Sequence, residues 1–441
     1  MRSRFLVELA LIAAALWGAR CGTREAAGSG SGGITPDAGY SGADAGTSGA
    51  PGDGGGGSMD AGTGSNSGNT DGGSDGGTVT GGTSTDAGSG GPSAGNDCTG
   101  LPAPADPGGA IASHFIWFRD STGNDGCSAG VVSGTGALAV TMEAPHYQTI
   151  DFVSSSGTLL ASKSGGGASA LIAAESGFIG NMFASAASWL EAWNDSGAQS
   201  TTTTHEQVAN VAEDPLGGVV ALTGGTTPQI TSFDTSLAVR WRVNRPADYP
   251  VALGVDREGA TLFLFDGTRL FGANTLAGMW VDHAGVAGNV FQMLGPQRDL
   301  AFRLPFALTQ RTGSGLFLAL GPAWVAQVDS LATASSAAPD WLQARPNVRL
   351  HMVRGGKGYA VLPVEAQDAQ DCVQSVEVVS PSGKSCGTTS FRAASGPCRT
   401  GPITVGYDGT VMQLAPDPDP AHQEWFGQGT CYWHWWPGLF R

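Results

Sequence analysis

The feature that most constrains the fold of this 441-residue chain is a short strand-and-turn pattern that recurs between residues 151 and 383. Each copy is an apolar or aromatic run that ends in a turn rich in Ser, Asp, Asn and Gly. The copies lie at residues 151–157, 189–197, 230–237, 279–285, 324–331 and 376–383. Their ends are 40, 40, 48, 46 and 52 residues apart. A strand repeated at such a period indicates an array of similar β-units.

A second apolar run precedes the pattern in several units. It occurs at residues 218–222, 260–265, 315–320 and 358–362. Short, continuously apolar runs are typical of strands covered on both faces, and units of 40 to 52 residues have the length of propeller blades. No helical stripe of any length interrupts residues 98–441. The sequence therefore predicts an all-β domain, a β-propeller of seven blades, with six or eight as alternatives.

The C-terminal sequence CYWHWW, residues 431–436, follows two further strand-like runs at 403–409 and 411–414. These three segments predict the first three strands of a seventh blade. The missing outer strand is assigned to residues 114–119, because a strand from the N-terminal side would close the ring and leave no open edge.

The aromatic residues of this segment have two interpretations. Alternation along a strand would place Trp433 and Trp435 on one side and His434 and Trp436 on the other, which favours packing between blades. The alternative is an exposed platform of Trp433, Trp435, Trp436 and His434 that stacks on sugars.

The N-terminal part of the chain has a different composition. Residues 22–97 are Gly, Ser, Thr, Asp and Ala with hardly any large apolar side chain, so we expect a disordered linker. From residue 25 to residue 97 this linker carries nine acidic residues and no basic one. Residues 1–21 begin with two arginines and continue with a short apolar stretch, as a secretory signal peptide does. The predicted organisation is 1–21 signal peptide, 22–97 linker and 98–441 propeller.

The chain has seven cysteines, an odd number, so at least one of them stays outside intramolecular disulfides; Cys21 is the candidate. Without Cys21 an even set remains, as expected for disulfides in an exported chain. The set is Cys98, Cys127, Cys372, Cys386, Cys398 and Cys431. Three disulfides are therefore predicted. Their connectivity is open, with a preference for Cys98–Cys127 and for pairing among the C-terminal four.

Residues 98–441 carry 18 Lys and Arg against 28 Asp and Glu, a net charge of −10, which argues against nucleic acid as a partner. Four arginines recur in the predicted connections between blades: Arg245, Arg298, Arg345 and Arg399. Guanidinium groups bind carboxylate or phosphate well, so these arginines are candidates for an anion-binding rim. The alternative is that each one pairs with a local acid such as Asp248.

No catalytic motif of the sequence lies in a suitable context. His205-Glu206 begins a zinc-protease pattern but lacks the second histidine, since Ala209 stands there. The seven histidines show no metal-ligand spacing, so no metal site is predicted, and no cofactor is indicated.

The sequence Gly18-Ala19-Arg20-Cys21 resembles the lipobox of bacterial lipoproteins, although Arg20 stands where a small residue is expected. Cleavage after Ala15 or Ala19 without lipidation is the alternative. The chain thus resembles tethered surface lipoproteins of Gram-negative bacteria with a β-propeller domain. This resemblance implies lipidation of Cys21, attachment to the outer membrane or cell surface, and a monomer.

Two function classes follow from this resemblance. The first is a non-catalytic binding module whose partner is a surface protein or an acidic glycan. The alternative is an extracytoplasmic propeller hydrolase or lyase that acts on a polysaccharide or another polymer. Its catalytic residues would come together only in three dimensions.

Overall fold

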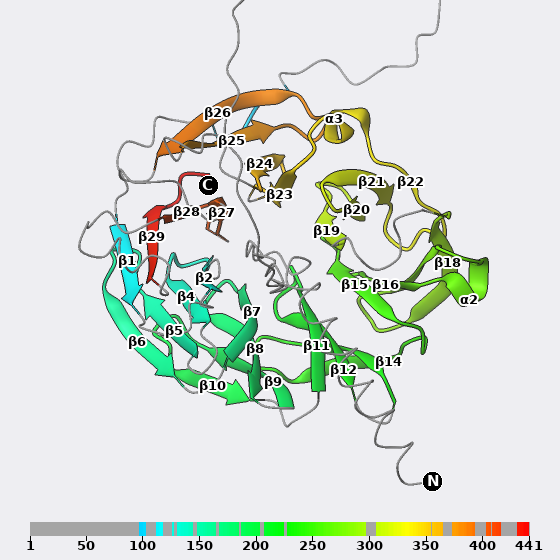
Figure 1. Cartoon of the computed structure of the whole chain (residues 1–441), viewed down its shortest axis with the longest axis horizontal. Coiled ribbons are helices and arrows are strands. Elements are labelled where there is room, and N and C mark those ends of the chain that lie inside the picture. The colour runs from blue at the N-terminus through cyan, green and yellow to red at the C-terminus, as the bar shows by residue number, and fades with distance from the viewer. Residues whose placement is uncertain are drawn as a thin grey trace, which may run out of the picture. The chain divides into compact units, whose positions relative to one another are not determined.

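A computed structural model shows seven antiparallel β-sheets that follow one another around a ring (Figure 1), which is a seven-bladed β-propeller. The residues that the structure describes are 97–102, 112–117, 126–127, 130–143, 148–164, 167–184, 187–202, 207–224, 227–296, 306–353, 355–364, 373–392, 403–406, 408–415 and 430–440. Among these residues, no helix has the length and apolar character needed to cross a membrane. The predicted signal peptide and the predicted linker up to residue 96 lie outside the described residues, whereas Asp97, the last residue assigned to the linker, is described.

The first four blades use consecutive strands. Blade 1 contains β2 (Gly126–Cys127), β3 (Val131–Val132), β4 (Leu138–Glu143), β5 (Gln148–Val153) and β6 (Leu159–Ser164). Blade 2 contains β7 (Gly167–Ala173), β8 (Phe178–Ala184), β9 (Ala187–Trp193) and β10 (Gln199–Thr202). Blade 3 contains β11 (Gln207–Glu213), β12 (Val219–Gly224), β13 (Gln229–Phe233) and β14 (Val239–Asn244). Blade 4 contains β15 (Pro250–Val255), β16 (Thr261–Asp266), β17 (Leu276–Val281) and β18 (Ala287–Leu294).

The last three blades include the closure of the ring. Blade 5 contains β19 (Phe306–Gln310), β20 (Leu316–Leu320), β21 (Ala323–Val328) and β22 (Ser336–Ala337). Blade 6 contains β23 (Val348–Met352), β24 (Tyr359–Pro363), β25 (Val373–Val379) and β26 (Ser385–Arg392). Blade 7 contains β27 (Ile403–Val405), β28 (Val411–Ala415), β29 (Thr430–Trp436) and β1 (Ala112–Trp117). Two short helices, α2 (Thr268–Phe271) and α3 (Asp340–Gln343), lie in connections.

The repeat recognised in the sequence is the third strand of blades 1 to 6 together with the turn that follows it. The preceding apolar runs are second strands, and every residue of β20 and β24 is buried. These strands are apolar on both faces because neighbouring blades cover both sides. The predictions of strand order and blade number are confirmed.

The turns of the blades share a local design. In blade 3, Asp234 accepts backbone N–H groups of Ser236 and Ala238 on its Oδ1, at 2.8 and 2.9 Å. The residue three positions after the acid has a positive φ, which favours glycine. Gly285 (φ 86°) meets this requirement in blade 4, whereas blade 3 places Leu237 (φ 63°) there. This backbone requirement explains why most copies of the pattern end in glycine.

The ring closes through β1, which pairs with β29 antiparallel over six residue pairs from Ala112–Trp435 to Trp117–Thr430. The predicted closure by a strand from the N-terminal side is confirmed. Because strand direction alternates within a blade, the loops divide between two faces. We call the face with the turns between first and second strands and between third and fourth strands the turn face, and the opposite one the connection face. Both helices lie on the connection face.

Candidate functional site

The tryptophans of β29 form no exposed platform. Trp433 and Trp435 are fully buried, Trp436 is 2% exposed and His434 is 8% exposed. Trp433 and Trp435 pack with residues of blade 1, and Trp436 packs against Phe391 of blade 6 at a ring distance of 4.8 Å. The platform hypothesis is therefore wrong, because both faces of this strand are covered by neighbouring blades. The interpretation as packing between blades is confirmed.

The described rim arginines are engaged locally. Arg345 donates to both carboxylate oxygens of Glu377 at 2.9 and 3.0 Å, and to the carbonyl of Trp341. These hydrogen bonds raise the pKa of Arg345. Arg245 donates to the carbonyls of Pro246 and Asp248, and burial lowers its pKa. Both guanidinium groups thus already donate to local acceptors, although the buried Nε of Arg245 has no partner among the described residues. Arg298 and Arg399 lie outside the described residues.

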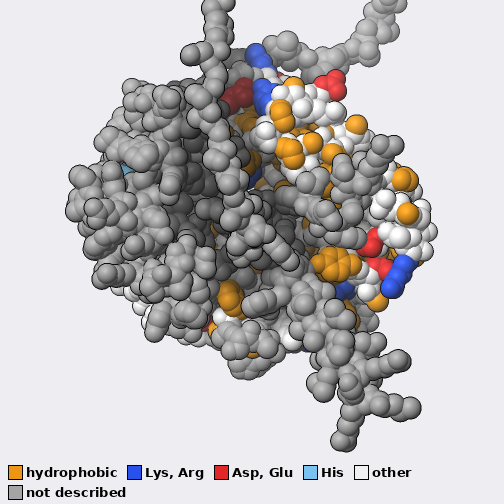
Figure 2. Space-filling model, in the orientation of Figure 1, with side chains coloured by type: hydrophobic (Ala, Val, Ile, Leu, Met, Phe, Trp, Pro, Cys, Tyr) orange, Lys and Arg blue, Asp and Glu red, His pale blue; other side chains and the backbone are white. Residues whose placement is uncertain are grey.

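Charged groups also meet on the outer part of the connection face. Figure 2 shows basic and acidic side chains side by side near the position that α2 occupies in Figure 1. Arg269 of α2 lies 3.4 Å from Asp248, and its side chain is 80% exposed. An ion pair this exposed contributes little to stability.

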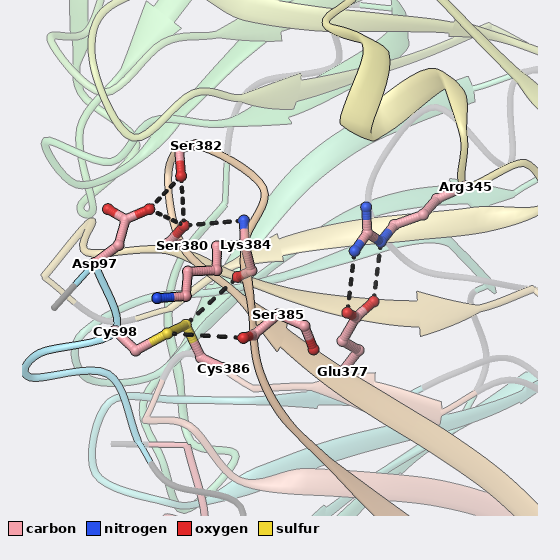
Figure 3. The surroundings of a disulfide bond; sticks show 9 residues. All are labelled: Asp97, Cys98, Arg345, Glu377, Ser380, Ser382, Lys384, Ser385 and Cys386. Atoms are coloured by element: carbon pink, nitrogen blue, oxygen red, sulfur yellow. Dashed lines mark hydrogen bonds and ion pairs between the residues drawn. A yellow bond between two sulfur atoms is a disulfide. The ribbon is translucent and has the colours of Figure 1, made fainter. Parts of the chain in front are cut away.

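The disulfide of the structure joins Cys98 to Cys386. The preferred pairing of Cys98 with Cys127 is therefore wrong, as is pairing of Cys386 within the C-terminal four. The physical reason is that residues 97–101 lie on blade 6, where Cys386 is the second residue of β26. Figure 3 shows Asp97 next to this bridge, where its carboxylate accepts hydrogen bonds from Ser380 and Ser382. These bonds lower the pKa of Asp97.

The remaining predicted cysteines carry no structural information. Cys21, Cys372 and Cys398 lie outside the described residues, and the side chains of Cys127 and Cys431 are not described either. Lipidation of Cys21 and two further disulfides stay predictions.

A cavity of about 540 Å³ lies at the centre of the ring. First strands of all seven blades line it, together with turn-face residues such as Pro215 and Gly406. Most lining residues are aliphatic, but many of their side chains are buried between blades, so backbone and a few polar side chains also face the cavity. The volume is in the range of small-molecule sites. Its described titratable groups are Glu175, Glu213 and His351.

Glu213 is the last residue of β11 and lies where the cavity meets the turn face. Its side chain is exposed to solvent at the edge of the cavity, while the protein atoms around the carboxyl desolvate it in part. This desolvation, together with the nearby charge of Asp214, raises its pKa to about 7. At neutral pH the carboxyl is therefore divided between its acid and its ionised form.

His351 lies in β23 and lines the same cavity. Burial lowers its pKa to about 4, so the imidazole is neutral at physiological pH. A neutral imidazole offers one N–H donor and one acceptor nitrogen to a ligand.

A second hollow of about 570 Å³ lies on the turn face between blades 2 and 3. Glu175 and Glu213 line it as well as the central cavity, so the two hollows meet at these residues. Asp214 also lines it, and Arg240 donates to this carboxylate at 2.7 Å. Trp193 and the exposed Leu216 add apolar surface.

Side chains link the turns around the mouth of the central cavity. Arg257 of blade 4 donates to the carbonyls of Thr312 in blade 5 and Gly355 in blade 6. Thr135 of blade 1 donates to Asp195 of blade 2 at 2.9 Å. Such links hold the turns of neighbouring blades in fixed relative positions. Within the described ranges, no cluster of three or more His, Cys, Asp or Glu side chains is arranged to hold a metal ion.

Sequence reasoning missed Glu213, His351 and Arg257. Their common property is a position at or just after the first strand of a blade, next to the ring axis. The repeat could have identified this position, because first strands precede the apolar second strands by one short turn. It could not have told which of these residues lacks a partner.

Comparisons with known proteins show little beyond architecture. No protein-family model matches the chain, and no curated protein matches its sequence. The WD40 domain of Pan2 from Neurospora crassa aligns with 11% identity and a TM-score of 0.44, over 74% of this chain and 94% of that one. Prolyl oligopeptidase B from Galerina marginata aligns with 8% identity and a TM-score of 0.42, over 68% and 49%. A protein of unknown function from Bacteroides caccae aligns with 11% identity and a TM-score of 0.31, over 63% and 85%. Likenesses this remote carry no argument about function.

Proposed function

We propose that this chain is an exported, tethered and non-catalytic binding module that takes a small ligand in the central cavity of its propeller. The observation that carries the proposal is the cavity of about 540 Å³, to which all seven blades contribute and which contains the carboxyl of Glu213 and the neutral imidazole of His351. Binding sites combine an apolar lining with a few placed polar groups in this way.

The anchoring part of the proposal rests on the sequence. Cys21 carries the lipid, residues 22–97 form the tether, and the propeller is held at the outer membrane or cell surface. An acidic glycan is a weaker candidate ligand than a neutral or cationic molecule. Glu213 would repel an anion in the cavity, and Arg245 and Arg345 already donate to local acceptors.

The test fills the cavity without changing the outer surface. Thr404 of β27 lines the cavity, so Thr404→Trp places an indole in it. Thr388→Trp is the matched control, since Thr388 is exposed on the outer strand β26. A panel of small polar metabolites is screened by thermal denaturation against the wild type and both variants.

A ligand present at a hundredfold excess over its Kd adds about 2.7 kcal/mol of stability. For a domain of 344 residues this corresponds to a rise in Tm of about 4 °C. We expect ligands that raise the Tm of the wild type and Thr388→Trp but not of Thr404→Trp. Ligands that stabilise Thr404→Trp equally would contradict binding in the cavity, and so would a panel without any ligand.

The anchor is tested separately by mass spectrometry of the mature protein isolated from membranes. An acylated N-terminal Cys21 supports the proposal. An unmodified N-terminus at Leu16 or Arg20 would contradict lipidation.

A further inference from the structure

The carboxyl of Glu213 has no counter-charge in the described part of the chain. Within the described part of the chain, it forms no hydrogen bond and no ion pair. The neighbouring Asp214 differs in this respect, because Arg240 donates to its carboxylate at 2.7 Å and to the carbonyl of Gly217. Desolvation raises the pKa of both acids, but only Asp214 has a basic partner that offsets this rise.

Among the residues that the structure describes, the other charged groups around the two hollows provide no cation for Glu213 either. Glu175 is a second acid at the same junction. His351 is neutral, since burial lowers its pKa to about 4. The guanidinium of Arg257 in the next blade is directed to the carbonyls of Thr312 and Gly355.

The acidic part of the tether, residues 25–97, is also unsuited to neutralise this carboxyl. Residues 25–97 carry nine acidic residues and no basic one, so they would be repelled by the junction of the two hollows. Among the described residues, no basic side chain compensates Glu213, so this place is open to a cation from outside the chain.

We propose that the ligand carries an ammonium or guanidinium group, and that this cation binds the carboxylate of Glu213 at the junction of the central cavity and the groove between blades 2 and 3. The inference rests on the proposed function and names the chemical class of its ligand. The apolar part of the ligand lies against the first strands, or against the exposed Leu216 in the hollow between blades 2 and 3.

Binding of such a cation depends on pH, because it requires the ionised form of Glu213. With a pKa of about 7, about 3% of the carboxyl is ionised at pH 5.5 and about 97% at pH 8.5. An aliphatic ammonium stays charged throughout this range. Affinity therefore rises about thirtyfold from pH 5.5 to 8.5, and a proton leaves the carboxyl for the buffer when the ligand binds below pH 7.

Isothermal titration calorimetry on the full propeller tests this inference with two probes, cadaverine and the neutral diol pentanediol of equal length. Cadaverine should bind the wild type more tightly at pH 8.5, whereas pentanediol should not bind measurably. Glu213→Gln removes the charge with little change in size, so it should weaken cadaverine binding at least tenfold at pH 8.5 and abolish the pH dependence. Glu258→Gln, an exposed turn residue of blade 4, is the matched control and should bind as the wild type does.

The outcomes separate this inference from the proposed function. If pentanediol binds as well as cadaverine and Thr404→Trp abolishes both, the cavity binds ligands but the preference for a cation is wrong. If cadaverine binding depends on Glu213 but is unaffected by Thr404→Trp, the cation site stands, and it lies in the groove rather than in the central cavity. Absence of cadaverine binding at pH 8.5, or equal binding to Glu213→Gln, overturns the inference.

Discussion

Removal of the Cys98–Cys386 bridge is the perturbation with the clearest expected magnitude. The bridge closes a segment with a sequence separation of 288 residues. In the chain-entropy description, a crosslink of this length destabilises the unfolded state by about 5 to 6 kcal/mol, and measured losses of native disulfides are about 2 to 5 kcal/mol. We therefore expect the double variant Cys98→Ser/Cys386→Ser to be less stable by about 2 to 6 kcal/mol.

The assay is differential scanning calorimetry of the oxidised propeller. For 344 residues, the unfolding entropy near 60 °C gives about 1.4 °C per kcal/mol, so the Tm should fall by about 3 to 8 °C. The control is Cys127→Ser, in which Cys98 should stay protected from thiol-specific labels. An unchanged Tm of the double variant would refute the reasoning on loop closure, and labelling of Cys98 in Cys127→Ser would refute the pairing.

Three further predictions concern stability. Deleting residues 112–117 removes β1 and exposes the edge of β29, so we expect a lower Tm and self-association, and size-exclusion chromatography showing an unaltered monomer would contradict this. Trp435→Ala removes a fully buried ring and should destabilise the protein by about 3 to 5 kcal/mol in urea denaturation, whereas an exposed platform residue would have almost no effect. The half-buried pair of Arg345 and Glu377 should add about 1 kcal/mol or less in a double-mutant cycle. Because Arg345 lowers the pKa of Glu377, this contribution is present above the ordinary pKa of a glutamate and is lost as the pH falls through the lowered value.

The architecture could be predicted because it depends on residue types that individual turns and strands require. A turn that begins with an acid such as Asp282 and ends with a positive-φ residue such as Gly285 needs those residue types at that spacing. The alternation of Trp433 and Trp435 with His434 and Trp436 likewise follows from strand geometry alone. The blade count and the closure depend only on these local patterns.

The pairing of Cys98 could not be predicted, since it depends on which blade the chain passes before it enters β1. Residues 98 and 127 are close in sequence, and loop closure alone favours them. The structure instead places residues 97–101 on blade 6, where Asp97 bonds to the turn before β26.

The cavity residues escaped prediction for another reason. Glu213 stands directly before the turn Asp214-Pro-Leu-Gly. A charged residue at this position is common in solvent-exposed hairpins, so the sequence alone does not mark it as a site residue. Its position beside the central cavity depends on seven first strands that are distant in sequence. The arginines were predicted as a site from their spacing in the sequence. Arg345, however, pairs with Glu377 in the third strand of blade 6, 32 residues away.

The position of the disulfide relative to the closing strand decides how the ring responds to mechanical load. A pull from the N-terminal side reaches Cys98 before it reaches Ala112, because the bridge precedes β1 in the chain. Without the bridge, the pull would act directly on Ala112, where β1 pairs with Trp435 of β29. The covalent bridge passes the tension to the outer strand of blade 6 instead. While that bridge is intact, the closing strand carries none of the load.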